Sequence, residues 1–326
     1  MFHTTAWLDA LHRSYGYRPV AYSSSAPGSA LRDGLVLCEV KSWLTGARLV
    51  SLPFSDHCDP LIDHPQILAQ SLATLQERVR HDRWRYLELR PLRELSCTGF
   101  LTSPSGHYFH HQIDLRPTLD LLFHGFHKNS TQRKIKRAER EKLSYQEGLS
   151  ELLLKSFYSL FVITRRRHRV PPQPLSWFRN LIACFKEALQ IRVALKNDQA
   201  VAAILTLRYK NTLTYKYGCS DPWFSRLGGT QMLFWKTIQE AKTLGLTSFD
   251  LGRSDADNAG LVQFKDRLGA ARSEMSYLRY YAHGQPTSGG VSDKNDWKLR
   301  LAKPIFGRSP DAVLRAVGHL LYRHIG

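Results

Sequence analysis

The sequence predicts an α/β protein in which mixed central sheets are flanked by helices. Apolar segments short enough for strands alternate along the chain with longer segments that repeat apolar residues at helical spacing. The 326 residues suffice for two domains or for one large one. Hydrophobic residues make up 43% of the chain and charged residues 23%, so the chain can bury a sizeable core.

The first α/β unit is predicted over residues 1–126. Apolar residues at Trp7, Leu8 and Leu11 indicate a first amphipathic helix. Pro53 and Pro60 interrupt regular structure and predict a loop between them. The other predicted elements of this unit are strands at 34–40, 48–52, 85–90 and 108–115, and helices at 67–79 and 118–126.

Residues 127–142 differ in composition from both flanking segments. They carry seven Lys or Arg residues against two acids, which gives a local charge of +5. Arg133 and Arg137 are four residues apart and share one face of a helix, and guanidinium groups suit phosphate oxygens. We therefore expect a phosphate-binding edge here, with a solvated linker helix between domains as the alternative.

Residues 143–285 form the second predicted unit. Two helices are followed by three strands, a helix, a strand, a helix and a last strand. A hairpin is expected to turn at Asn197–Asp198. The expected helices span 148–164, 175–190 and 229–244, and the expected strands span 191–196, 200–209, 212–217, 247–251 and 274–281.

The stretch 245–271 concentrates candidate functional residues. Its strand is expected to end at Gly252, and an N-capped helix then follows. The apolar residues that recur at helical spacing in that helix are Leu261, Phe264 and Leu268. On this pattern Lys265 lies on another side of the helix and is free to leave the core. It follows the end of a strand, where open α/β sheets bind ligands.

Two further candidate sites lie earlier in the second unit. Prolines forbid helix in the loop predicted over 164–174, where Arg165 and Arg167 can line a groove for an acceptor. A basic surface loop without a function is the alternative. Tyr217 is expected at the exit of its strand, where its hydroxyl can donate a proton to a leaving group.

A glycine-rich turn precedes the helix predicted over 229–244. Gly228 and Gly229 would present backbone N–H groups to a donor phosphate, and Arg226 would add a positive charge. A purely structural turn is the alternative. No nucleotide-binding P-loop and no Ser-His-Asp or Cys-His spacing stands out, and the histidines show no pattern of metal ligands. The adjacent His110 and His111 would point to opposite faces of a strand.

The sequence FDLGRSDADNAGLVQFKDRLGA resembles the closing motif of the Fem-type peptidyltransferases and of their relatives in the GNAT acyltransferase superfamily. The matching residues are Asp250, Leu251, Gly252, Arg253, Phe264, Lys265 and Gly269. Segment 127–142 resembles the inter-domain segment of this family, and 48–61 resembles a Leu-Pro-Phe turn found in it and in polysaccharide-linked acyltransferases. The resemblance covers most of residues 1–285 and implies tandem GNAT-like domains.

The resemblance also implies acyl transfer by positioning, in which an acceptor amine attacks a thioester or ester carbonyl. It gives Lys265 the role of neutralising developing charge or of holding phosphate, and it gives Arg253 the role of anchoring an anionic group. Phe264 belongs to the same substrate-binding motif. Asp250 would accept a proton, with pairing to Arg253 or capping of a turn as alternatives. Gln231 departs from the coenzyme A motif, which has a small residue at that position.

The net charge of +18 favours an anionic partner, such as tRNA, coenzyme A, a diphosphate-bearing precursor or the inner membrane surface. The five cysteines are scattered without a CxxC pair, which favours a reducing cytoplasm. The N-terminal residues show no charged leader followed by a long apolar run, so a cytoplasmic location is expected. Residues 286–326 are expected to form a flexible linker and an amphipathic helix, docked on the body or lying on a membrane.

Three functions are compatible with these features. The leading hypothesis is a Fem-like N-acyltransferase that moves an aminoacyl group from aminoacyl-tRNA to an amine of a peptidoglycan precursor. The second is an acyl-CoA-dependent N-acetyltransferase that modifies an exopolysaccharide or an amino sugar. The third is a non-catalytic basic module that binds RNA or an anionic membrane. No bound cofactor is expected beyond these co-substrates, and no oligomeric state is predicted.

Overall fold

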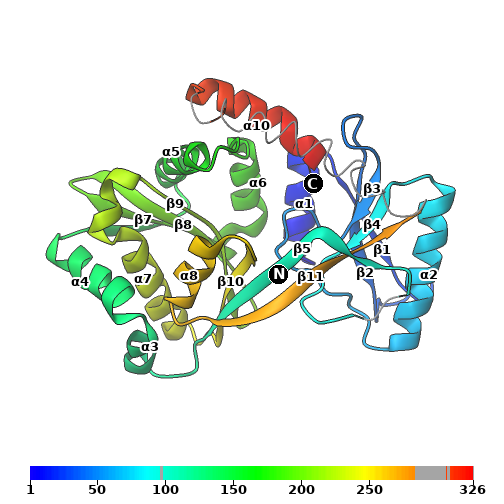
Figure 1. The fold of residues 1–326 in the computed structure, drawn as a ribbon, viewed down its shortest axis with the longest axis horizontal. Helices are drawn as coiled ribbons and strands as arrows, with labels where there is room; N and C mark the ends of the chain where they lie inside the picture. The colour runs from blue at the N-terminus through cyan, green and yellow to red at the C-terminus, as the bar shows by residue number, and fades with distance from the viewer. Residues whose placement is uncertain (96–97, 283–305, 307–308, 326) are drawn as a thin grey trace. The chain divides into compact units, whose positions relative to one another are not determined.

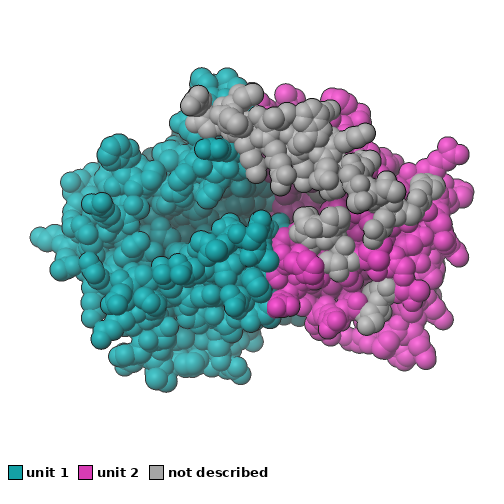
Figure 2. Space-filling view, in the orientation of Figure 1, with its two compact units in different colours: residues 1, 109–273, 306–315 teal, residues 2–108, 274–305, 316–326 magenta. Residues whose placement is uncertain are grey.

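The computed structural model describes residues 1–95, 98–282, 306 and 309–325 (Figure 1). The chain divides into two compact units, coloured separately in Figure 2. The central unit comprises residues 109–273 with 306–315, and the N-terminal unit comprises residues 2–108, 274–305 and 316–326. Each unit is described by itself.

The N-terminal unit contains a five-stranded mixed arrangement in the order β1-β2-β3-β4-β11. Strands β3 and β4 are parallel, and the other neighbouring pairs are antiparallel. The first helix begins at Thr4, whose hydroxyl accepts from the Trp7 amide, and ends at Gly16 in the left-handed conformation. The elements are α1 (Thr5–Tyr15), β1 (Arg18–Tyr22), β2 (Leu35–Val40), β3 (Arg48–Val50), α2 (Pro65–His81), β4 (Tyr86–Leu89) and β11 (Ala271–Tyr281).

The central unit contains strands in the order β5-β10-β9-β8-β7-β6. Its strands are β5 (Leu101–Asp114), β6 (Ser144–Gly148), β7 (Leu189–Lys196), β8 (Gln199–Tyr209), β9 (Thr212–Ser220) and β10 (Ser248–Asp255). Its helices are α3 (Leu119–Gly125), α4 (Arg133–Arg140), α5 (Glu151–Arg167), α6 (Leu175–Phe185), α7 (Gly229–Thr243) and α8 (Ala259–Asp266), with short turns η1 (Lys128–Gln132), η2 (Lys186–Ala188) and η3 (Pro222–Leu227).

Apolar side chains divide between the two faces of this sheet. Ile135 of α4 and Phe234 of α7 belong to one buried cluster, which also contains Phe249 of β10. On the other face Phe157 of α5 and Phe178 of α6 pack edge to face at 5.2 Å between ring centroids. Figure 1 shows α5 and α6 on one side of strands β7–β9 and α4 and α7 on the other.

The predicted α/β class and the predicted order of two helices, three strands, helix, strand, helix and strand are confirmed. The hairpin turns at Asn197 and Asp198, both with positive φ. Strand β6 was not predicted, because SYQEG has little apolar character and pairs at the sheet edge. Helix α5 runs on to Arg167, three residues past its predicted end.

Two predicted strand ends are wrong, and both matter for the site. Gly252 does not end its strand: it has a φ of +69° and lies inside β10, which continues to Asp255. Tyr217 does not lie at a strand exit, because β9 continues to Ser220. The prediction treats Gly252 as the end of a strand, whereas this glycine lies inside β10 with a positive φ.

The compact units do not follow the predicted boundaries at 126 and 143. Residues 109–126 and 127–142 belong to the central unit, since α3 and α4 pack into its core. Residues 274–281 belong to the N-terminal unit, where β11 pairs with β4. Local composition cannot reveal this division, because β5 and β11 each contribute residues to both units.

The end of the chain forms helix α10 (Asp311–Ile325), as expected for an amphipathic helix. Its first turn contacts α5 through an ion pair of Asp311 with Arg166 and through Arg315, which lies 5.3 Å from the Tyr158 ring centroid. Of its apolar residues, Leu314 is buried, whereas Val313 and Leu320 are exposed. The predicted linker over 286–305 lies outside the described residues.

Candidate functional site

Strands β9 and β10 separate part-way along their length. They pair in parallel at Ser248–Thr212, Phe249–Leu213 and Asp250–Thr214, and the shared register ends there. Both strands then continue, to Ser220 and to Asp255. We call the opening beyond Asp250 and Thr214 the fork. The ladder between the two strands ends at this point, so the fork can receive an extended ligand or a polarised carbonyl.

Asp250 lies at the base of the fork and is buried. Its Oδ1 atom accepts a hydrogen bond from the Gly252 amide at 2.7 Å and lies 2.9 Å from Nε2 of His110 on β5. His110 is buried as well. The Arg253 guanidinium lies 3.6 Å from the Asp255 carboxylate. The arrangement is a buried histidine–carboxylate pair, a common form of general base.

Lys265 projects from α8 and is buried, with 2% of its surface exposed. Its ammonium donates to the carbonyl oxygens of Gly252 at 3.1 Å and Arg253 at 2.7 Å. The prediction that Lys265 leaves the core is therefore wrong. Helix α8 buries Val262 and Lys265 and leaves Phe264 partly exposed. The lysine can be buried because two β10 carbonyl oxygens accept hydrogen bonds from its ammonium group.

His111 lies beside this lysine and is fully buried. Its Nε2 lies 3.3 Å from Oδ1 of Asp266, outside the geometry of a hydrogen bond, so neither ring nitrogen has a hydrogen-bond partner among the described residues. Burial, followed by repulsion from Lys265, lowers the pKa of His111 to about 4, although Asp266 acts in the opposite direction. His111 is therefore neutral near pH 7.

The polar groups around His110 and those around His111 lie on opposite faces of the strands. Because His110 and His111 are adjacent in β5, their side chains point in opposite directions, as the sequence predicted. His110 and Asp250 thus lie on one face, and Lys265 and Asp266 lie on the other, with His111. The two groups meet only at the β10 backbone: Asp250 accepts from the Gly252 amide, and Lys265 donates to the Gly252 carbonyl.

Residues 125–266 match the family described as the acetyltransferase (GNAT) domain. This part of the chain is therefore similar to a GNAT acetyltransferase domain. The match includes the fork, Asp250 and Lys265, whereas all of β5, with His110, lies before it.

Relatives of the chain extend this likeness. Over 108 residues, 33% of this chain, it is 27% identical to the UDP-N-acetylmuramoylpentapeptide-lysine N(6)-alanyltransferase of Weissella viridescens. The chain spans about a third of that relative's length, 31%. Among solved structures, FemX aligns with a TM-score of 0.68 at 14% identity, over 86% of this chain and 92% of FemX. A tandem GNAT protein from the clavulanic acid biosynthesis pathway aligns at 0.51 and 12% identity, over 80% and 82%. These structures confirm the predicted fold class.

In the GNAT domain Tyr217 lies within a cluster of aromatic rings. Its hydroxyl accepts a hydrogen bond from the Trp177 indole at 2.9 Å, and the rings of Phe161 and Phe178 pack edge to face against it. Tyr217 is buried in the middle of β9 and serves the packing of α5 and α6. This position suits a structural residue better than the predicted proton donor at a strand exit.

The glycine turn at the start of α7 is present as predicted. Gly228 has a φ of +83°, and a Cβ atom there would collide with the Lys134 carbonyl of α4. A Cβ on Gly229 would meet Val201 at 3.2 Å. Packing therefore requires both glycines. The turn also lacks a side-chain cap for α7, so its first amides remain available for a phosphate, and Arg226 is exposed beside it.

The arginines predicted to bind the substrate lie in different parts of the central unit. Arg133 lines a cavity of about 530 Å³ with Lys128, Lys136 and Arg140, whereas Arg137 turns to Glu141 at 3.7 Å. We call four of these cations, Lys128 of η1 with Arg133, Lys136 and Arg140, the basic surface of α4. Arg165 and Arg167 belong to the last turn of α5 and not to a loop, and the Arg165 guanidinium lies 4.9 Å from the Phe161 ring centroid. Phe264 packs against Phe234 at 5.6 Å between ring centroids.

None of the helices among the described residues combines the length and the apolar character that crossing a bilayer requires. The histidine pair was missed from the sequence because His110 and Asp250 are 140 residues apart and meet only through the adjacency of β5 and β10. The alternation of Gln112, Ile113, Asp114 and Leu115 gives the side of the strand on which each histidine lies but not its partner.

Proposed function

We propose that the chain is a Fem-like N-acyltransferase that transfers an acyl or aminoacyl group to a primary amine of a cell-envelope precursor. The observation that carries the proposal is the Asp250–His110 pair at the base of a strand fork inside a GNAT domain. The name of the Weissella viridescens relative supports an amine acceptor on a muramoyl peptide.

The chemistry follows from what each group can do at the fork. The attacking amine must lose a proton, and the Asp250–His110 pair accepts it, with the carboxylate stabilising the imidazolium. Backbone N–H groups along the fork stabilise the oxyanion of the tetrahedral intermediate. Collapse of this intermediate breaks the acyl bond to the donor, and the donor's oxygen or sulfur leaves with the proton that the pair took from the amine. Lys265 acts as a positioning residue: its ammonium holds the Gly252 and Arg253 carbonyls and so fixes the edge of β10.

Two donors remain candidates, each with its own support. The uncapped N-terminus of α7, with Arg226, fits the phosphates of an acyl-CoA. The charge of +18 and the basic surface of α4 fit the backbone of an aminoacyl-tRNA. We favour the aminoacyl-tRNA because the relative that is 27% identical over 33% of this chain is an alanyltransferase. A cytoplasmic location, with peripheral contact to the inner membrane surface, accompanies either donor.

The test is a transfer assay with both donors. Purified protein is incubated with a mixture of charged tRNAs or with acetyl-CoA, together with a lysine-containing UDP-muramoyl pentapeptide or an amino sugar, and products are identified by mass spectrometry. We expect an aminoacylated muramoyl peptide with the tRNA donor. Acetylation of the amino sugar alone would establish the acyl-CoA alternative. Steeply salt-dependent RNA binding without any transfer would overturn catalysis and leave a binding module.

A further inference from the structure

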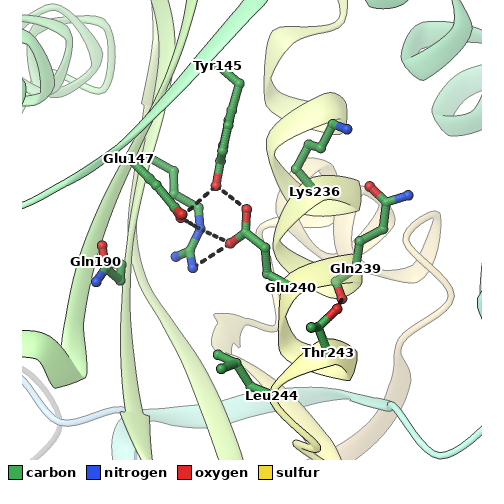
Figure 3. Close-up of a pocket in the computed structure, with 9 residues that line it drawn as sticks. Tyr145, Glu147, Gln190, Lys236, Gln239, Glu240, Thr243 and Leu244 are labelled. Atoms are coloured by element: carbon green, nitrogen blue, oxygen red, sulfur yellow. Dashed lines mark hydrogen bonds and ion pairs between the residues drawn. The ribbon is translucent and has the colours of Figure 1, made fainter.

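A cavity of about 620 Å³ lies between strands β6 and β7 and the C-terminal half of helix α7 (Figure 3). Residues that line it and carry the argument are Tyr145, Glu147, Gln190, Arg192, Glu240 and Leu244. This volume is in the range of small-molecule sites, about 300–1,000 Å³. The cavity lies entirely within the central unit and away from the fork, because it uses the end of α7 opposite to Gly228.

The donor groups around the cavity are already engaged. Arg192 is buried, and its Nε donates to Glu240 Oε2 at 2.8 Å while Nη1 donates to Thr206 at 2.6 Å. The Tyr145 hydroxyl lies 2.5 Å from Glu240 and 3.0 Å from Glu147. Burial raises the pKa of Tyr145, so its single proton stays in place and is shared between these carboxylates. We therefore do not expect Arg192 or Tyr145 to donate a hydrogen bond to an acceptor group of a ligand.

The cavity can still bind a hydrogen-bond donor that carries a positive charge. Glu147 and Glu240 both face the Arg192 cation, and the other cation of the lining, Lys236, points its ammonium away from both carboxylates in Figure 3. The Oε1 atom of Gln190 is buried and has no hydrogen-bond partner in the part of the chain that the structure describes. Leaving such an acceptor unpaired costs about 1–3 kcal/mol.

The acceptor groups of Glu147 and Gln190 lie near each other on the sheet. Glu147 pairs in register with Arg192 across the antiparallel β6–β7 ladder, and Gln190 is two residues before Arg192 on the same face of β7. Glu147 and Gln190 are therefore diagonal neighbours, within reach of a single bridging group. Leu244 supplies an apolar wall at the end of α7.

We propose that this cavity binds a small molecule that carries a primary ammonium group on a short aliphatic chain. The ammonium donates to Glu147 and to Gln190 Oε1, and the aliphatic chain lies against Leu244. The ligand neutralises the surplus carboxylate and satisfies the unpaired oxygen at once. This site is separate from the proposed acyl transfer and does not depend on it.

The test is calorimetric titration of the full chain with n-pentylamine at pH 7.5, with 1-pentanol as the uncharged ligand of equal length. Glu147→Gln removes the charge of a half-exposed side chain, and Gln190→Leu removes the unpaired acceptor. The matched control is Glu187→Gln, an exposed glutamate outside the cavity. We expect saturable binding of the amine, weakened about 10-fold by each cavity variant and unchanged in the control.

Three results would overturn the proposal: no saturable binding of the amine, equal binding of pentanol, or an affinity in both cavity variants equal to that of the parent chain. Gln190→Leu also keeps the test independent of folding, because loss of an unpaired buried acceptor should leave the melting temperature equal or higher. All measurements are of binding alone, so failure of the proposed acyl transfer does not affect them.

Discussion

Asp250 and His110 are the residues on which the proposed chemistry depends most. Asp250→Asn keeps the size of the side chain but removes the charge that stabilises a protonated His110. We expect turnover to fall by about 10²- to 10⁴-fold while the protein stays folded. The measurement is the steady-state rate with whichever donor is active. Asp257→Asn, on an exposed turn after β10, is the control and should retain full activity; equal loss in both variants would contradict the assignment.

Lys265 is predicted to matter for stability before it matters for rate. Lys265→Met keeps the apolar volume but leaves the Gly252 and Arg253 carbonyls without their donor. We expect the free energy of unfolding to fall by about 2–4 kcal/mol, measured by urea denaturation. Unchanged stability would show that the carbonyls find other donors. Unchanged turnover of the folded variant would remove Lys265 from the mechanism altogether.

His111 makes stability depend on pH. Its pKa is lowered from 6.5 to about 4, so between these values the unfolded chain binds the proton and the folded chain does not. The contribution is therefore present above pH 6.5 and is lost as pH falls towards 4. We expect about 2 kcal/mol of unfolding free energy to be lost through this group between about pH 7.5 and 5.

The check is urea denaturation at both pH values, with His111→Phe beside the parent chain. The variant should lose about 2 kcal/mol less than the parent over this interval, because phenylalanine does not titrate. His107→Phe, at an exposed position of β5, should keep the parent's dependence. An identical pH dependence of the parent and His111→Phe would refute the explanation.

The residues that sequence reasoning placed wrongly share one physical cause. A periodic pattern treats lysine as polar, yet Lys265 is buried because two backbone carbonyls accept its protons. Arg165 was assigned to a loop because prolines follow it, but helix α5 holds it against Phe161. In each case a partner in the folded chain, rather than the local pattern, decides the environment. Asp250 was found from its motif, while His110 required knowledge of the strand order.

At the scale of elements, local patterns located nearly every helix and strand because burial of one face imposes the period. What they did not give is where strands stop pairing. The fork arises because β9 and β10 diverge after Asp250 and Thr214, and no residue type marks that point. The edge strand β6 escaped notice because it buries few side chains.

The turn before α7 gives a prediction about close packing of elements. Gly228→Ala places a Cβ against the Lys134 carbonyl of α4 and also strains a φ of +83°. We expect a loss of more than about 2 kcal/mol of unfolding free energy. Gly245→Ala is the matched control, since Gly245 has a φ of +70° but nothing within 4 Å of an added Cβ. Its expected cost is only the backbone strain, about 1 kcal/mol. Equal losses would show that α4 shifts freely.

At the scale of the whole molecule, charge distinguishes the two donors. A net charge of +18 attracts any polyanion, so binding of RNA by itself decides little. What discriminates is whether the affinity depends on a defined surface. The basic surface of α4 places Lys128, Arg133, Lys136 and Arg140 around one cavity, with Glu139 as its acid.

If the donor is a tRNA that lies on this surface, exchanging its charges must change the salt dependence of binding. Each phosphate neutralised contributes about −0.7 to −0.9 to the slope of log affinity against log salt. We therefore expect Arg133→Glu with Lys136→Glu to make the slope shallower by about 1.5 to 2, measured by filter binding across a salt series. Arg13→Glu with Lys155→Glu changes the net charge equally at exposed positions elsewhere and should leave the slope close to that of the parent. Equal slopes in both pairs would mean that tRNA is held by diffuse charge only, and saturable acetyl-CoA binding by the same variants would then assign the donor role to the thioester.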